Sequence, residues 1–161
     1  MSFYTPEFVQ SMYHSSRSTW RGFVTGISIG IGLAILANII FGKLTEEREI
    51  ISYILILSIV VAAVALIYSF RLYNERVKDA VDDGMHLPDK MNRHRNALVL
   101  YLVICCIPIY ISVFGFVITG NYYLFVVVAM SFGAVLIKAP TKEKMISELH
   151  LTSRDRADLY A

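Results

Sequence analysis

The side chains with the most chemical potential are the acidic and histidine residues between positions 79 and 94. They are Asp79, Asp82, Asp83, His86, Asp89 and His94. Carboxylates and imidazoles bind divalent metals, and the first three aspartates share one face if the segment is helical. Their spacing nevertheless matches no standard metal motif, and acidic residues on an exposed helix normally face water. We expect a solvated surface here, with no metal and no cofactor.

Two adjacent cysteines, Cys105 and Cys106, lie in the middle of an apolar run. Neighbouring cysteines are not a CxxC redox pair, and two thiols alone cannot hold a metal. We expect buried thiols that act in packing. The sequence also contains no GxSxG, HExxH or P-loop motif and no paired catalytic carboxylates. No catalytic residue is therefore predicted.

The composition indicates which elements carry these residues. Of the 161 residues, 56% are hydrophobic and 17% are charged, whereas soluble domains carry about 25% charged residues. The mean hydropathy is +0.56. These values exclude a soluble enzyme domain, a disordered chain and a nucleic-acid binder with a strongly basic face. We expect an integral membrane protein whose partners are the lipid bilayer and other transmembrane helices, with no nucleic acid.

Four apolar runs are candidates for membrane spans: 22–42, 51–70, 97–119 and 122–138. A crossing helix needs about 20 apolar residues, and none of the runs alternates polar with apolar as a barrel strand does. The fourth run is short and ends in Lys138, whose long stem can reach the interface. The predicted fold is an all-α bundle of four transmembrane helices in a single domain, 1–161.

Helices are also expected outside the bilayer. Thr5 can cap an amphipathic N-terminal helix whose apolar face, formed by Phe8, Val9, Met12 and Tyr13, would rest on the membrane or on a partner. The second span is expected to continue as a helix that stops at Gly84. A second helix, capped by Asp89, would then complete a hairpin over 71–96. The tail 139–161 is expected to form short helices capped by Thr141 and Ser153.

The positive charges predict the orientation. The N-terminal tail has two Lys or Arg residues, the hairpin has six, and Lys138 with the C-terminal tail has five, against two in the first loop and none in the third. The positive-inside rule places both termini and the hairpin in the cytoplasm. Trp20 would then lie in the interfacial aromatic belt on that side. We expect an integral protein of a bacterial inner (plasma) membrane.

Small residues recur every four positions in the first run, at Gly22, Gly26, Gly30 and Ala34. Such a ridge lets another helix backbone approach closely. Ala129 and Gly133 in the fourth run offer a smaller matching groove. Two uses remain open, which are packing within this chain and packing between subunits.

A few polar side chains border or interrupt these runs. Asn38 continues the glycine row, where its amide would hydrogen-bond across a helix interface or line a path for an ion or substrate. Basic residues next to the spans are possible contacts for lipid headgroups, namely Arg71, Lys90, Arg93 and Arg95.

The leading functional hypothesis is a non-enzymatic membrane protein, either a helix-packing subunit of a complex or a small homo-oligomer that conducts. One alternative is a sensor or adaptor that docks partners through the hairpin and tail. The other is a small four-helix membrane enzyme acting on a lipid or thiol conjugate. Chain length, span count and Arg71, Asn74 and Glu75 at the end of a span are similar to those of the membrane-associated glutathione and eicosanoid enzymes.

Overall fold

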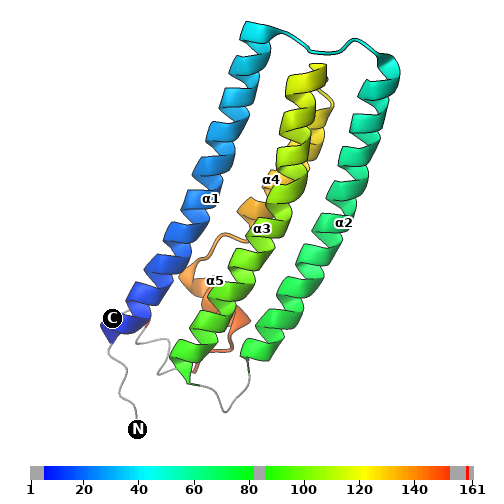
Figure 1. Cartoon of the computed structure of the whole chain (residues 1–161). Helices are drawn as coiled ribbons and strands as arrows, with labels where there is room; N and C mark the ends of the chain where they lie inside the picture. The colour runs from blue at the N-terminus through cyan, green and yellow to red at the C-terminus, as the bar shows by residue number, and fades with distance from the viewer. Residues whose placement is uncertain (1–5, 82–85, 153–158, 160–161) are drawn as a thin grey trace.

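The computed structural model describes residues 6–81, 86–152 and 159, and these residues fold into α-helices (Figure 1). The helices are α1 (Pro6–Phe41), α2 (Arg48–Ala80), α3 (Leu87–Thr119), α4 (Leu124–Ile137) and α5 (Lys142–Glu148). The prediction of an all-α fold is therefore confirmed. We call the end of the bundle that carries α5 the α5 end; the opposite end carries the α3–α4 turn at Gly120.

The central helix is α3, which packs against α1, α2 and α4. In Figure 1, α1 and α2 flank it on either side, and α4 lies behind it. Cys105 and Cys106 are buried on α3, as expected of packing thiols. Because α3 makes the most extensive contacts with α1, α2 and α4, it organises the bundle.

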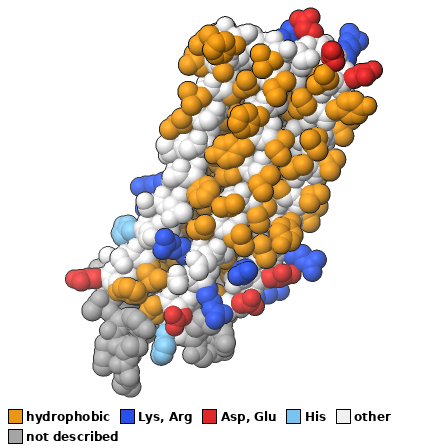
Figure 2. Space-filling model, viewed as in Figure 1, with side chains coloured by type: hydrophobic (Ala, Val, Ile, Leu, Met, Phe, Trp, Pro, Cys, Tyr) orange, Lys and Arg blue, Asp and Glu red, His pale blue; other side chains and the backbone are white. Residues whose placement is uncertain are grey.

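Three helices, α1, α2 and α3, are long and apolar enough to cross a membrane. The fourth predicted run is shorter, because α4 has 14 residues and is followed by a 79° bend into α5. Fourteen residues span about 21 Å, less than the ~30 Å of a hydrocarbon core. A fourth crossing is possible only if the bent pair counts as one span. Figure 2 shows hydrophobic side chains over the middle of the visible face and charged ones near both ends.

Helix α2 also packs through small residues, although the sequence shows no glycine row there. The buried face of α2 includes Ser58, Ala62, Ala65 and Ser69. Their alternating spacing of four and three keeps them on one stripe toward α3. Small side chains allow close approach of the two backbones, and the Cys105 thiol reaches the Ser69 hydroxyl at 3.4 Å. This stripe explains why α2 follows α3 along its length.

The bundle contains a second hydrophobic core at its α5 end. Its buried residues are Val9, Tyr13, Ala80, Met91, Met145, Leu149, Leu151 and Leu159. The prediction of a separate N-terminal helix lying on the membrane is therefore corrected. Helix α1 is continuous from Pro6 to Phe41, and Val9 is only 1% exposed. Because α2, α3 and the chain after α4 supply apolar partners, the face with Val9 and Tyr13 packs on protein.

The helix boundaries correct one predicted cap and confirm another. Helix α3 begins at Leu87 after His86, so Asp89 lies inside the first turn and does not cap it. Thr141 does cap α5, because its hydroxyl accepts a hydrogen bond from the Lys144 amide at 3.2 Å. Thr5, Gly84 and Ser153, the other predicted helix signals, lie outside the described residues.

Candidate functional site

The predicted acidic and histidine segment does not stay together in the structure. His94 is 2% exposed and turns into the protein, whereas Asp79, His86 and Asp89 are exposed. Asp82 and Asp83 lie outside the described residues. In the described part of the chain, no three His, Cys, Asp or Glu side chains are grouped to hold a metal.

His94 belongs instead to a buried polar cluster, which we define as Tyr73, His94, Lys138 and Glu148. The Glu148 Oε2 atom accepts a hydrogen bond from the Tyr73 hydroxyl at 2.6 Å and contacts His94 Nε2 at 2.8 Å. Its other oxygen, Oε1, is 3.5 Å from Lys138 Nζ. The Tyr73 hydroxyl and His94 Nε2 are 3.2 Å apart. Three groups from separate parts of the chain thus converge on one carboxylate.

The cluster depends on the bend between α4 and α5. Lys138 is the residue that ends α4, and Glu148 is the last residue of α5. The bend returns α5 toward α2 and α3, so Glu148 reaches Tyr73 on α2 and His94 on α3. The Lys138 ammonium also lies 4.0 Å from the centroid of the Tyr73 ring, a favourable cation–π distance.

The electrostatics keep Glu148 ionised. Burial raises the pKa of this carboxyl, but hydrogen bonds from His94 and Tyr73 and the positive charge of Lys138 lower it to about 2. Hydrogen bonds to a charged group favour the charged form. The His94 Nδ1 atom is buried and has no hydrogen-bond partner among the described residues. The cluster therefore holds one carboxylate firmly and leaves one imidazole nitrogen unused.

The arrangement fixes the position of α5 and offers little room for a reaction. Each group is held by another member of the cluster, and Glu148 and Lys138 are both mostly buried. Sequence reasoning missed this cluster, because Glu148 is 54 residues from His94 and 75 from Tyr73 along the chain. An isolated glutamate in a polar tail carried no signal of such a contact.

The end of α4 is capped by side chains from elsewhere in the fold. A helix leaves its last four carbonyls without intrahelical partners. The carbonyls of residues 134 to 137 are satisfied in order by the Tyr101 hydroxyl, the Trp20 indole N–H, the Ala139 amide and the Lys144 ammonium. Trp20, predicted at the membrane interface, thus bonds to protein at this level. These contacts allow α4 to stop inside the bundle.

Only one end of the small-residue row of α1 packs against other helices of this chain. Ala34 is buried in the main core, and a Cβ added at Gly30 would come within 4.0 Å of Tyr110. Gly22 and Gly26 are exposed, and an added Cβ would meet no described atom within 4 Å. A depression of about 320 Å³ runs past both glycines. The part of the row toward the α5 end therefore forms an open face.

The smaller groove predicted on α4 does not receive this row. Ala129 is exposed, and an added Cβ at Gly133 would meet no described atom within 4 Å. Both positions are thus open surface in this chain.

Asn38 lies near the α3–α4 turn and not in the middle of the bundle. It is three residues before the end of α1, and its Nδ2 atom would be 3.6 Å from a Cβ added at Gly120. Gly120 has φ 65°, so it ends α3 in the left-handed conformation. Asn38 Nδ2 is buried and makes no hydrogen bond with the described residues. The amide therefore faces the end of α3, without the hydrogen bond expected across the helix interface.

The basic residues predicted at the lipid headgroups have different surroundings. Arg71 forms an exposed ion pair with Glu75, with Nε and Oε1 3.0 Å apart. Arg93 reaches from α3 to α2, where its Nη1 donates to the Asp79 carbonyl at 3.4 Å. Lys90 and Arg95 are partly buried on α3. Only Arg93 among these four is shown to bridge two helices.

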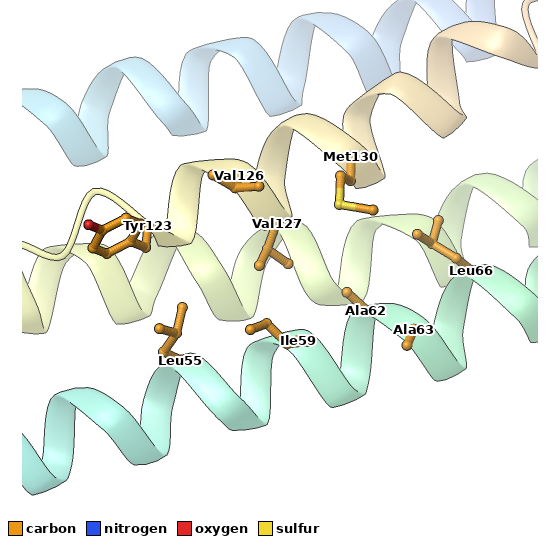
Figure 3. A pocket seen from close by; sticks show the side chains of 9 residues that line it. All are labelled: Leu55, Ile59, Ala62, Ala63, Leu66, Tyr123, Val126, Val127 and Met130. Atoms are coloured by element: carbon orange, nitrogen blue, oxygen red, sulfur yellow. The ribbon is translucent and has the colours of Figure 1, made fainter.

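An apolar groove lies between α2 and α4, with a volume of about 410 Å³ (Figure 3). Ala62 and Ala63 line it from α2, Val126 and Met130 line it from α4, and Tyr123 lies at one end. The groove exists because α4 packs on α3 and touches α2 much less. The Tyr123 hydroxyl is the one polar side-chain group among its lining residues.

The chain matches no protein-family model, and neither the curated proteins nor the solved structures show a match to it. The functional proposal therefore rests on the geometry of this chain alone.

Proposed function

We propose that this chain is a non-enzymatic subunit of a membrane complex. It packs the open face of α1, defined by Gly22 and Gly26, against a transmembrane helix of another polypeptide or of a second copy. The observation that carries the proposal is the empty space beside both glycines. A glycine inside a helix costs about 0.5–1 kcal/mol relative to alanine, and no close contact with the described residues compensates for that cost at these two positions.

A partner helix would compensate for the cost of these glycines, because its backbone could approach α1 closely. Lipid tails are as apolar as leucine side chains, so helices in a membrane associate through packing, and small residues permit the closest packing. Helix α2 uses this device within the chain, through Ser58 and Ala62 against α3. Helix α1 presents the same kind of surface outward. An external helix is the occupant that matches it.

The proposed topology has four crossings, with α4 as a short fourth span that bends into α5. The α5 end lies in the cytoplasm, because the tails, the hairpin and Lys138 at that end hold 13 of the 15 Lys and Arg residues. The corresponding location is a plasma membrane, the inner membrane in a bacterium. The second core and the buried polar cluster would then form a small cytoplasmic cap on the bundle.

The placement of Asn38 favours the subunit over a conducting oligomer. A conducting ring would bring several copies of a polar residue around one axis. Asn38 faces the end of α3, while the open part of the α1 row is some twelve residues away along the helix. We therefore assign the open face to packing and no polar path to this chain.

The test compares leucine substitutions at two glycines of α1. Gly26→Leu fills the open face, whereas Gly32→Leu adds the same side chain on another side of the helix, where space is also empty. Both variants should stay folded, with melting temperatures in detergent at or above that of the parent. Gly26→Leu alone should lose the assembled species seen by light scattering or by cross-linking in native membranes. Retention of the assembly in Gly26→Leu, or equal loss in both, would contradict the proposal.

A further inference from the structure

A small polar pocket opens between α2 and α3, beyond the apolar part of both helices. Its volume is about 150 Å³, and it is lined by Arg76 and Asp79 from α2 and by Arg93 and Asn96 from α3. It is separate from the buried polar cluster and from the open face of α1. Its polar lining and two arginines point to an anionic ligand.

The pocket is built by the packing of two antiparallel helices. Within each pair the residues are three apart, so each pair shares one helix face. Arg93 is held across the gap by its bond to the Asp79 carbonyl at 3.4 Å. Neither arginine makes an ion pair with a carboxylate in the described part of the chain. Two guanidinium groups therefore line one space together with a single carboxylate, that of Asp79, which leaves the lining with an excess of one positive charge.

The pocket begins at the level of a lipid headgroup layer and extends outward from it. Arg76 is six residues beyond Phe70, where the uncharged run of α2 ends, which is about 9 Å along a helix. Asn96 directly precedes the uncharged run of α3, and Arg93 is about 5 Å further out. The headgroup layer extends roughly 5–8 Å beyond the hydrocarbon on each side. If α2 and α3 cross the membrane, Asn96 and Arg93 lie within that layer and Arg76 lies at its outer edge.

We propose that this pocket binds the phosphate of a phospholipid headgroup. The guanidinium groups of Arg76 and Arg93 and the amide of Asn96 donate to the phosphate oxygens, since arginine forks match phosphate geometry. Asp79 accepts a hydrogen bond from the ammonium or hydroxyl group carried by the headgroup. Asp79 lies further from the apolar run of α2 than Arg76 does. This order matches the lipid, whose ammonium or hydroxyl group lies further from the bilayer centre than its phosphate. The inference uses the membrane placement of α2 and α3 but not the open face of α1.

The test measures lipid retained by the full-length protein in detergent by native mass spectrometry. Phosphatidylethanolamine, phosphatidylglycerol and phosphatidylcholine are the probes, and Arg76→Gln, Arg93→Gln and Lys78→Gln are the variants. Loss of either pocket arginine should weaken binding of the first two lipids roughly ten-fold, because a charged hydrogen bond is lost. Lys78→Gln removes an exposed positive charge of α2 outside the pocket and should bind as the parent does. Lipid-free melting temperatures should differ little, since all three side chains are exposed and the bond from Arg93 to the Asp79 carbonyl is long.

Two further measurements separate the alternatives. Phosphatidylcholine has no N–H or O–H donor, so the parent should bind it more weakly than phosphatidylethanolamine, and Asp79→Asn should remove that difference. Inorganic phosphate should compete only weakly, whereas equal affinity for it would overturn the lipid as the ligand. Unchanged lipid binding after Arg76→Gln and Arg93→Gln together would overturn the site. Gly26→Leu should bind lipid normally, which distinguishes failure of this proposal from failure of the proposed subunit.

Discussion

At the scale of single residues, Glu148 has the greatest effect on the arrangement of the chain. Its carboxylate is contacted by Tyr73, His94 and Lys138, which belong to α2, α3 and the end of α4. Removing one partner of a buried charged contact leaves the other charge unpaired. The free energy of unfolding then falls by more than the net contribution of the pair. The ionised Glu148 side chain therefore helps to hold α5 on the bundle, together with the burial of Met145 and Leu149 in the second core.

We expect Glu148→Gln to lower the melting temperature in detergent near neutral pH, and this difference to vanish in acid. The folded-state pKa of Glu148 is lowered from 4.5 to about 2. A depressed folded-state pKa gives stability that is present above the unfolded value and is lost as pH falls from about 4.5 to 2. The contribution is at most about 3 kcal/mol. Melting curves of the parent and variant between pH 2 and 7 measure it.

Glu143→Gln is the matched control for this prediction. Glu143 lies in the first turn of α5 and is exposed, so its substitution should shift the melting temperature much less than Glu148→Gln does. Tryptic cleavage at Lys142 and Lys144 at pH 8 should also be faster in Glu148→Gln, because α5 is released. A constant difference between parent and Glu148→Gln across the whole pH range would contradict the role of ionisation.

At the scale of the elements, identical glycines in long apolar helices have opposite surroundings. Gly115 of α3 packs against α2 and α4, and an added Cβ would lie 2.7 Å from Ile54 Cγ2 and 3.1 Å from Leu124 Cδ1. A Cβ added at Gly32 of α1 would have no atom of the described residues within 4 Å. The contrast arises because α3 is surrounded by helices and α1 packs mainly on α3.

We therefore expect Gly115→Ala to destabilise the protein and Gly32→Ala to leave it unchanged or more stable. Overpacking a tight contact costs about 1–3 kcal/mol, whereas alanine in place of an unconstrained helix glycine contributes up to about 1 kcal/mol. Thermal unfolding of both variants in the same detergent measures the difference. A lower melting temperature for Gly32→Ala than for Gly115→Ala would contradict the packing of α3 between α2 and α4.

At the scale of the whole molecule, the asymmetry between the two ends is the main feature. The end with α5 carries a second core, a buried polar cluster and most of the positive charge. The other end has two short connections, of which 43–47 is mostly exposed and Gly120–Tyr123 forms a turn. The α5 end thus carries most of the structure outside the long apolar segments, whereas the described connections at the other end are short.

We expect reporter fusions at Ala161 and after Glu46 to report opposite sides of the membrane. The C-terminal reporter should be active in the cytoplasm, because positive loops stay on that side. The fusion after Glu46 should be active only on the other side. A C-terminal reporter active outside the cytoplasm would overturn the proposed orientation, and signals from the same side would exclude a crossing by α2.

The sequence alone determined the helical class, three long apolar helices, the burial of Cys105 and Cys106 and the Thr141 cap. These features follow from local composition and from short-range hydrogen bonding, which act within a few turns of one segment. Tertiary structure decided which glycines are enclosed, that Val9 and Tyr13 meet protein, and that Glu148 meets His94 and Tyr73. Such contacts join residues far apart in the chain, and their existence depends on how α3 collects its neighbours and how α4 bends into α5. A repeating spacing shows that residues share a face, but only the packed bundle decides what that face touches.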